Sequence, residues 1–405
     1  MTNLYRPLRS LREGNWFKLI CGASFQHLPA VRSLTLAYAL AGADCVDVAA
    51  DPAVIGVAQD ALRVADRLKA QGWGSQVEGL PWLMVSLNDG EDPHFRKAEF
   101  NASLCPADCA RPCETICPAQ AIVFGQTNYF SGVVDSICYG CGRCLPVCPI
   151  QNISTRAYVS TPAAIAPLVL TGVDAVEIHT QVGRTEDFCR LWSAIQPQVH
   201  QLKLVAISCP DGTGLIEYLW SLYDLVSPLP CPLIWQTDGR PMSGDIGDGA
   251  TRAAIRLGQK VLAAGLPGYV QLAGGTNRHT VSKLQALGLT QNRPPISLPS
   301  TQSARIAGVA YGSYARSILA PLLAELESPN SQPNPSSNFG VAELSTGDKA
   351  AFGSATLASI SAPTRLEQVP ELLQQAVDQA RLLVSQLKSS APHPSFEDFL
   401  SETDQ

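Results

Sequence analysis

Residues 203–236, KLVAISCPDGTGLIEYLWSLYDLVSPLPCPLIWQ, predict a strand, a helix and a second strand in that order. Apolar runs occupy positions 203–208 and 232–236, and a Leu-rich, helix-like stretch lies between them at 215–225. Near-continuous apolar strands of this kind are typical of a parallel sheet that helices cover on both faces. The segment therefore predicts one strand–helix–strand unit of an α/β protein.

The same alternation extends over residues 17–326. Six further strand-like runs complete a set of eight, at residues 17–20, 45–49, 83–87, 175–179, 269–273 and 306–311. Helix-like stretches lie between most of them, at residues 29–40, 53–70, 187–199, 250–264, 281–287 and 313–326. Eight parallel strands, most of them followed by a helix, predict a closed (β/α)8 barrel of the TIM type. Two open α/β sheets fit the same pattern and are the alternative.

Cysteine is the most informative residue type in this chain. Eight of the 13 cysteines form two runs, Cys105-x3-Cys109-x3-Cys113-x3-Cys117-Pro118 and Cys138-x2-Cys141-x2-Cys144-x3-Cys148-Pro149. The second run matches the bacterial ferredoxin pattern C-x2-C-x2-C-x3-C-P in full. The first run departs from it, because three residues instead of two separate its cysteines. Zinc sites also use C-x2-C pairs, but two full runs are more specific to iron–sulfur clusters.

The ferredoxin pattern also predicts how the ligands divide. Three thiolates of a run bind one cluster, and the fourth binds the cluster of the other run. The pattern thus predicts two 4Fe–4S clusters, one held by Cys138, Cys141, Cys144 and Cys117 and the other by Cys105, Cys109, Cys113 and Cys148. The wider spacing of the first run leaves the type of the second cluster open. We expect Ile116, Ile122, Val147 and Ile150 to form a dry shell around the clusters.

The cysteine block interrupts the barrel pattern between its third and fourth strands. We therefore expect a ferredoxin-like domain at residues 89–155, inserted between two parts of the barrel at 1–88 and 156–327. Loops that follow barrel strands lie at the C-terminal face, so the insertion should overhang the barrel mouth. A Pro- and Ser-rich linker follows at 328–345. The extension at 346–405 contains an amphipathic helix at 365–388, which either packs on the barrel or docks a partner.

Two glycine-containing loops follow the seventh and eighth strands. Their candidate ligand-binding residues are Gly274, Gly275, Thr276, Gly312 and Ser313. Barrels often bind phosphate with these two loops, and the pair is similar to the phosphate-binding end of flavin mononucleotide (FMN) barrels. The simpler interpretation is two glycine turns with Thr or Ser as helix caps. Other polar residues expected at this end are Asn88, Asp89, His179, Asp211, Asp238 and Arg240.

Composition excludes several classes of protein. The net charge is −6, from 29 basic and 35 acidic residues, so nucleic acid is not an expected partner. The start of the chain lacks a signal-peptide pattern and no window supplies an apolar membrane span, which predicts a cytoplasmic protein. The cysteines outside the two runs are expected to be structural: Cys21, Cys45, Cys189, Cys209 and Cys231. A reactive thiol is the alternative at Cys21 and Cys209.

The two cysteine runs within an α/β chain resemble the cyanobacterial light-dependent period protein family (LdpA). The resemblance covers most of the chain and is weakest after residue 328. It implies an iron–sulfur protein that senses cellular redox state and passes light information to the circadian clock. Clock input and output proteins and redox carriers would be its partners. Only the eight cysteines match residues with a role in that family.

Three functions are compatible with these features. The first is a redox sensor or electron relay, which need not be an enzyme. The second is a flavin-dependent oxidoreductase, whose clusters would feed electrons to a flavin in the barrel mouth. The third is an assembly scaffold with structural clusters.

Overall fold

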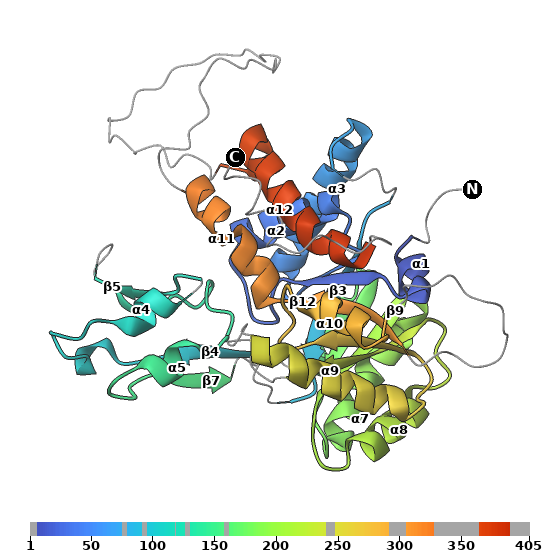
Figure 1. The fold of residues 1–405 in the computed structure, drawn as a ribbon. Coiled ribbons are helices and arrows are strands. Elements are labelled where there is room, and N and C mark those ends of the chain that lie inside the picture. The colour runs from blue at the N-terminus through green and yellow to red at the C-terminus, as the bar shows by residue number, and fades with distance from the viewer. Residues whose placement is uncertain are drawn as a thin grey trace, which may run out of the picture.

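A computed structural model describes residues 6–74, 79–90, 95–117, 119–125, 130–157, 162–239, 248–290, 305–327 and 364–388. The chain forms a closed barrel with a smaller lobe beside it, the insertion, drawn in teal and green in Figure 1. The barrel contains the eight strands expected from the sequence: β1 (Trp16–Ile20), β2 (Cys45–Ala49), β3 (Trp82–Asn88), β8 (Ala175–His179), β9 (Leu204–Pro210), β10 (Leu233–Asp238), β11 (Tyr269–Ala273) and β12 (Ile306–Tyr311).

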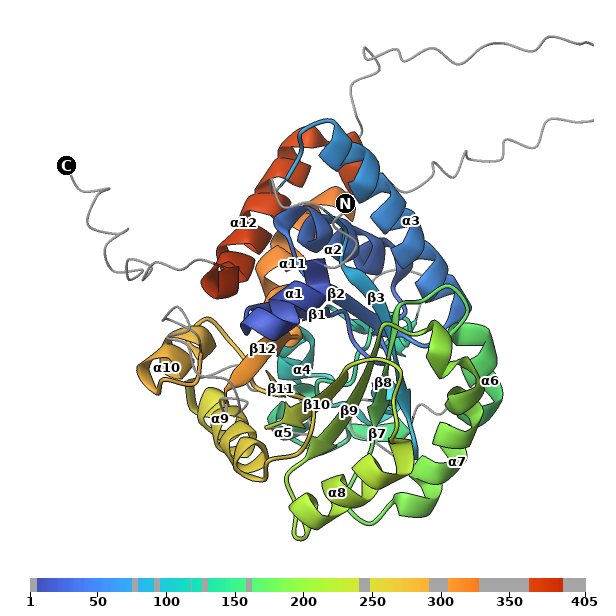
Figure 2. The same ribbon diagram turned by 90° about the vertical axis from the view of Figure 1, so that its right-hand side faces the viewer.

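All eight strands are parallel and follow one another around the barrel in chain order, with β12 pairing back to β1. This closure confirms the predicted TIM-like barrel and excludes two open sheets. Helices surround the strands (Figure 2). They are α2 (Leu28–Ala41), α3 (Pro52–Ala70), α6 (Pro162–Val169), α7 (Thr185–Ile195), α8 (Leu215–Val226), α9 (Asp248–Ala263), α10 (Thr280–Ala286) and α11 (Ser313–Glu327), with a 3-10 turn η3 (Gln196–Gln201) after α7.

Local sequence sets where several helices begin and end. Asp51 caps α3, because its carboxylate accepts hydrogen bonds from the Ala53 and Val54 N–H groups at 2.8 and 3.2 Å. Gly42 ends α2 in the left-handed conformation with a φ of 99°. The sequence did not predict α6, which begins only after the insertion and contains Pro167. In the chain it lies between the insertion and β8.

The barrel is closed at its N-terminal end and open toward the insertion. Helix α1 (Arg6–Glu13) lies across the N-terminal end in Figure 2. Its Leu11 packs with Trp16, Trp82 and Met84 in an apolar cluster of their own. A larger apolar core fills the layer between the strands and the surrounding helices. Among the described residues, α1 and this cluster cover the N-terminal end, and a pocket opens at the C-terminal end.

The insertion consists of short elements held by two small antiparallel sheets. One sheet pairs β4 (Arg96–Glu99) with β7 (Ser154–Ala157), and the other pairs β5 (Ile122–Phe124) with β6 (Ser131–Val133). The remaining elements are η2 (Ala102–Leu104), α4 (Pro112–Ile116) and α5 (Cys144–Val147). Strand β7 continues two residues past the expected end of this lobe at residue 155, because it pairs along the full length of β4.

The last described segment packs on the barrel. A 3-10 turn, η4 (Leu366–Gln368), leads into α12 (Pro370–Lys388), which contacts α2 and α11. Leu373, Val377 and Ala380 are fully buried in this contact. Arg32 on α2 forms a two-bond ion pair with Glu367, with both N–O distances 2.7 Å. The structure thus has a helix packed on the barrel that begins at Pro370, five residues later than expected, whereas the predicted linker at 328–345 lies outside the described residues.

Candidate iron–sulfur site and barrel mouth

The loop that carries the second cysteine run forms one side of a pocket in the insertion. Cys138 and Cys141 lie on this loop, Cys144 begins α5, and Cys117 follows α4. All four line the same pocket, together with the small side chains of Ala98, Ala119 and Ala121. The structure therefore brings together the four cysteines predicted to hold one cluster.

Glycine is required in this loop. Gly140 has a φ of +70°, and a Cβ at this position would lie 2.0 Å from the carbonyl oxygen of Arg96 on β4. Gly142 also has a positive φ, of 73°. Because L residues rarely adopt such backbone angles, both glycines let the loop turn tightly between the cysteines. Gly140 in addition allows close packing against the β4–β7 sheet.

Backbone N–H groups point at several of the cysteine sulfurs. Ala98 N–H donates to Cys138 Sγ at 3.4 Å, and Ala121 N–H donates to Cys117 Sγ at 3.3 Å. Asn152 N–H donates to Cys148 Sγ at 3.3 Å, and its side-chain amide donates to Cys105 Sγ at 3.6 Å. Such hydrogen bonds stabilise thiolate ligands and tune the potential of the cluster they hold.

The first run and the end of the second form another group. Cys113 on α4 is buried, and the neighbouring Cys148 and Cys105 interact with it electrostatically. The sulfur of Cys109 accepts a hydrogen bond from the Arg111 N–H at 3.5 Å. The place of Cys109 in this group rests on its spacing in the sequence.

The pKa values reflect this crowding of thiols. Burial, followed by repulsion from Cys141, Cys138 and Cys117, raises the pKa of Cys144 to about 12. Burial and the same kind of repulsion raise the pKa of Cys113. Burial also acts on Cys148, but hydrogen bonds from the backbone N–H groups after it outweigh this effect and lower its pKa. The positively charged iron–sulfur core of a cluster would relieve the repulsion among the thiolates. Because thiols must lose their protons to become ligands, binding of a cluster would release protons.

The apolar shell differs from the expected one. Ile122 is buried, and Val147 packs against the cysteine cluster of the core. Ile116 and Ile150, in contrast, are 40% and 43% exposed. They lie directly before Cys117 and two residues after Cys148. Ala98, Phe124 and Ile153 fill the shell in their place.

The donor set suits an iron–sulfur cluster. Thiolates are the ligands of such clusters, and N–H donors and a largely apolar wall surround them here. Within the described ranges, no three Cys, His, Asp or Glu side chains converge closely enough to hold a single metal ion. Three thiols of the second run, those of Cys138, Cys141 and Cys144, instead surround a shared space together with the Cys117 thiol, as the separate irons of a cluster require.

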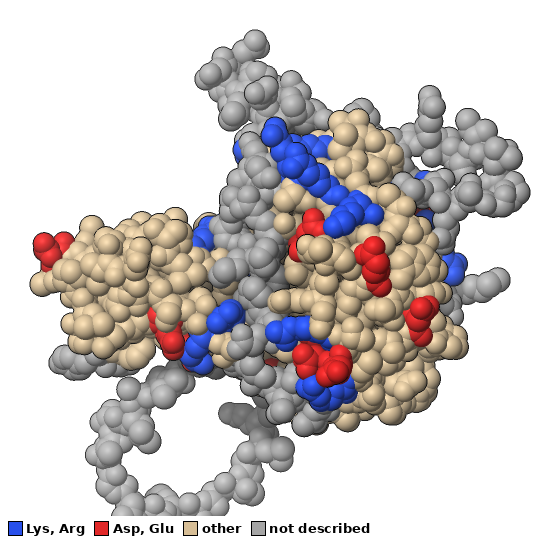
Figure 3. All heavy atoms as spheres, turned by 90° about the horizontal axis from the view of Figure 1, so that it is seen from below, with Lys and Arg blue, Asp and Glu red and all other residues tan. Residues whose placement is uncertain are grey.

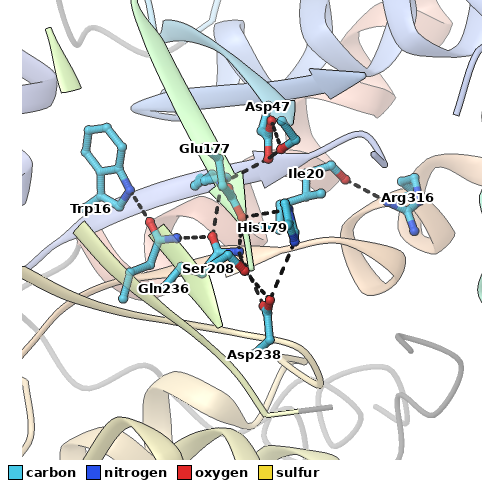
Figure 4. Close-up of polar contacts among 12 residues, drawn as sticks. Trp16, Ile20, Asp47, Glu177, His179, Ser208, Gln236, Asp238 and Arg316 are labelled. Carbon is cyan, nitrogen blue, oxygen red and sulfur yellow. Dashed lines mark hydrogen bonds and ion pairs between the residues drawn. The ribbon is translucent and has the colours of Figure 1, made fainter. Parts of the chain in front are cut away.

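A network of buried polar side chains runs through the barrel (Figure 4). Lys18 on β1 contacts Asp47 at 3.0 Å and also pairs with Glu177. Gln236 accepts a hydrogen bond from Lys18 at 3.0 Å and donates one to Glu177. His179 Nε2 lies 3.0 Å from the Glu177 carboxylate. Burying unpaired charges is costly. Each charged group of this network accordingly has an oppositely charged or hydrogen-bonding neighbour.

At the C-terminal end of the barrel, several side chains of this network line a pocket, the barrel mouth. Asp47, Ser86, His179, Gln236 and Asp238 line one part of it. The predicted loop residues line another part: Gly274, Gly275, Thr276, Gly312 and Ser313. Arg316 on α11 and two residues of the insertion, Tyr139 and Gly140, complete the wall. The insertion therefore does overhang the barrel mouth, as expected.

The simpler interpretation of the glycine loops is wrong for Thr276. Its hydroxyl donates to the Ala310 carbonyl at 2.6 Å, and α10 begins only at Thr280, where His279 is the N-cap residue. Ser313 is the first residue of α11. Gly274 and Gly275 have φ angles of 60° and 107°, so this turn needs glycine. The loop therefore crosses the mouth as an open turn and does not cap a helix at Thr276.

The other polar residues expected at this end divide into two groups. His179 and Asp238 line the pocket. Asn88 and Asp89 are buried at the end of β3 but do not line it, and Asp211 is directed to Lys260 with a separation of 2.7 Å. Arg240 lies outside the described residues.

Several site residues were not predicted from the sequence: Lys18, Asp47, Ser86, Tyr139, Glu177, Gln236 and Arg316. A signal for some of them exists. Lys18, Asp47 and Glu177 each interrupt an otherwise apolar strand, and a charged residue inside a buried strand must have a partner. The stacking of Arg316 on Tyr139 joins residues far apart in sequence and leaves no such signal.

The five cysteines outside the two runs differ in burial, and Cys189 and Cys231 are only partly buried. Cys21, Cys45 and Cys209 are buried beside or within barrel strands. Burial raises the pKa of Cys21 to about 12, and it raises the pKa of Cys231 to about 11. Because Cys21 is fully buried and burial disfavours its thiolate, its position supports the structural role expected for it.

Comparison with known proteins assigns the chain to a family. Residues 105–159 match the LdpA Fe-S cluster-binding domain, and residues 168–386 match the Light dependent period A C-terminal domain. Fold and site thus define an iron–sulfur protein built on a (β/α)8 barrel. The chain is 51% identical to Light dependent period A of Synechococcus elongatus over 321 residues, which are 79% of this chain and 85% of the relative. The chain belongs to the light-dependent period A family, as its sequence motifs indicated.

Two solved structures show a distant likeness. A (S)-3-O-geranylgeranylglyceryl phosphate synthase from Thermoplasma acidophilum is 13% identical, with a TM-score of 0.28 over 78% of this chain and 92% of that chain. A pyruvate kinase from Cryptosporidium parvum is 10% identical, with a TM-score of 0.33 over 95% of this chain and 74% of that chain. No helix in the described ranges is both long and apolar enough to cross a membrane.

Proposed function

We propose that this protein is a redox sensor that passes light-dependent changes of cellular redox state to the circadian clock. Two 4Fe–4S clusters take up or release single electrons as the redox carriers of the cell are reduced or oxidised. The change in cluster charge alters contacts with clock input and output proteins. The observation that carries this proposal is the grouping of eight cysteines in the insertion of a chain from this family.

The contacts of the cysteines support the crossed division of ligands. Cys117 shares its pocket with Cys138, Cys141 and Cys144 and not with its own run. Cys148 in turn interacts with Cys113 of the other run. This exchange of the fourth cysteine is the arrangement of two-cluster ferredoxins. It supports one cluster held by Cys117 with the second run and one held by Cys148 with the first.

The surface of the insertion supports contact with protein partners. Figure 3 shows mostly uncharged residues over this lobe in the view from below. On the insertion as a whole, four large apolar side chains are 40–62% exposed: Leu104, Ile116, Phe130 and Ile150. Leu104 and Ile116 each directly precede a cysteine of the first run. A redox carrier that docks against these side chains would come close to a cluster.

The potentials of the clusters test the sensing role. We expect an anaerobic redox titration, followed by electron paramagnetic resonance, to show reversible one-electron reduction at or above roughly −400 mV, the potential of a plant-type ferredoxin. Potentials far below those of any cellular carrier would contradict a sensor and favour a scaffold with structural clusters.

The link to the clock needs a test in cells. We expect Cys144→Ser to abolish the dependence of the circadian period on light intensity, because the cluster can no longer report the redox state. Cys189→Ser is the matched control, since Cys189 lies on α7, away from the insertion. A light-dependent period that is unchanged in Cys144→Ser cells would contradict the proposal.

The alternative function, a flavin-dependent oxidoreductase, requires a flavin in the barrel mouth. Flavin released in stoichiometric amount from anaerobically purified protein favours this enzyme. Broad sulfur-to-iron absorption without flavin favours the sensor.

A further inference from the structure

We propose that the barrel mouth binds a phosphate-bearing small molecule and that this ligand contacts the loop of Cys138 and Cys141. Arg316 and the start of α11 would hold the phosphate. The carboxylates of Asp47 and Asp238 would accept hydrogen bonds from the body of the ligand. The binding site can exist whether or not the proposed function is correct. Its coupling to a cluster, in contrast, rests on the function proposed above.

Arg316 provides a buried positive charge at this pocket. Its side chain is only 8% exposed, and its Nη1 donates to the Ile20 carbonyl at 2.8 Å. Its Nε has no hydrogen-bond partner, and no carboxylate in the described part of the chain pairs with its guanidinium. Figure 4 shows Arg316 beside Ile20, apart from the carboxylates of the barrel. Burial of a charge without a counter-charge is unfavourable, so an anionic ligand would stabilise this site.

The backbone beside Arg316 also favours an anion. Gly312 and Ser313 lie at the start of α11, a helix of 15 residues, and both line the pocket. A Cβ on Gly312 would lie 3.6 Å from Arg316 Nη1, so the guanidinium lies directly over this helix start. The N–H groups and the dipole of a helix N-terminus attract negative charge. Guanidinium and helix terminus therefore act on the same point in space.

The opposite part of the pocket selects a different chemical group. Asp47 and Asp238 line it with Ser86, His179 and Gln236. Carboxylates repel a second anion and accept hydrogen bonds from N–H and O–H groups. The pocket therefore fits a phosphate ester whose body carries hydrogen-bond donors better than it fits a molecule with two separate anionic groups.

The pocket shares a wall with the cysteine site. Tyr139 and Gly140 line both the barrel mouth and the pocket of Cys117, Cys138, Cys141 and Cys144. Arg316 stacks on the Tyr139 ring, with its Cζ 4.0 Å from the ring centroid. A phosphate bound at Arg316 would thus feel the charge of the cluster. Reduction adds a negative charge to the cluster, so it should weaken the binding of the anion.

Calorimetry on the anaerobic, cluster-containing full chain tests the site with inorganic phosphate, FMN and riboflavin. We expect phosphate and FMN to compete for one site and riboflavin, which lacks the phosphate, to bind at least about tenfold more weakly than FMN. Arg316→Gln should weaken binding by at least about tenfold, since hydrogen bonds to charged groups contribute that much. Arg316→Lys should retain part of the affinity. Arg190→Gln is the control, because Arg190 is 66% exposed on α7.

Near-ultraviolet circular dichroism shows whether each variant is folded. Phosphate binding without FMN binding would support the phosphate site and exclude flavin as the body of the ligand. Absence of phosphate and FMN binding to the folded wild-type protein would overturn the proposal. Unchanged affinity in folded Arg316→Gln would overturn it as well.

A second titration on dithionite-reduced protein tests the coupling. We expect phosphate affinity to fall about fivefold, at the lower end of usual coupling between sites. Equal affinity in both redox states of a cluster-containing protein would refute the coupling and leave the binding site intact. A protein without iron that still binds phosphate through Arg316 would instead contradict the proposed redox sensor.

Discussion

Arg316 of the barrel stacks on Tyr139 of the insertion, with 4.0 Å between the guanidinium carbon and the ring centroid. Tyr139 lies between Cys138 and Cys141. Phe25 of the barrel packs edge-on against its ring, with 5.7 Å between the two ring centroids. The Gln26 N–H also donates to the Ser136 carbonyl at 3.1 Å. The cysteine loop is therefore attached to the barrel mouth, and a change in the loop can reach the barrel directly.

The crossed division of ligands predicts which cysteine variants resemble each other. Cys117→Ser and Cys144→Ser should lose the same electron paramagnetic resonance signal and about half of the iron. Cys113→Ser and Cys148→Ser should lose the other signal. Cys231→Ser, on the barrel, should retain both. Loss of the same signal in Cys117→Ser and Cys113→Ser would show that each run holds its own cluster.

Gly140 should be irreplaceable for a steric reason. Gly140→Ala places a Cβ 2.0 Å from the Arg96 carbonyl oxygen, so the loop must move and its cluster should be lost. Gly183→Ala is the matched control, because Gly183 also has a positive φ, of +91°, but has nothing within 4 Å of the added Cβ. This control should cost about 1–2 kcal/mol of stability and leave the iron content unchanged. Equal iron content in both variants would contradict the steric argument.

Lys18 should be essential for the stability of the barrel. Lys18→Met leaves Asp47 and Glu177 without their cation inside the barrel. We expect a loss of about 3–5 kcal/mol in the free energy of unfolding, measured in urea. Lys203→Met, which breaks a half-exposed pair with Asp174, should cost less than about 1 kcal/mol. Similar losses in the two variants would indicate that the buried pairs contribute little.

The position of α12 predicts that its apolar face stabilises the barrel. Leu373→Ala removes a side chain that is 1% exposed, and it should lower the free energy of unfolding by about 2–5 kcal/mol. Leu382→Ala on the same helix alters a side chain that is 69% exposed, and it should change stability by about 0.5 kcal/mol or less. A single urea transition that is equally affected by both variants would argue against the packed helix.

Much of the fold could be predicted from the sequence. The eight apolar runs became the eight barrel strands, because buried parallel strands need such residues along their whole length. The cysteine spacing predicted that Cys117 meets Cys138, Cys141 and Cys144, because the ferredoxin pattern exchanges the fourth cysteine between its two runs. Helix α6 was missed because it follows the insertion and carries a proline in its interior.

The barrel mouth could be predicted only in part. Gly274 and Gly312 were expected there because barrel topology fixes where each loop ends. Arg316 and Tyr139 come from segments 177 positions apart, and only the docking of the insertion brings them together. Exposure of Ile116 and Ile150 likewise depends on how the lobe folds around its cysteines, which residue type alone does not determine.

Iron and acid-labile sulfide analysis of the anaerobically purified full chain tests the central claim most directly. The account predicts about eight irons and eight sulfides per chain, as two 4Fe–4S clusters require. Stoichiometric zinc bound by the eight cysteines, or disulfides among them without iron, would contradict it.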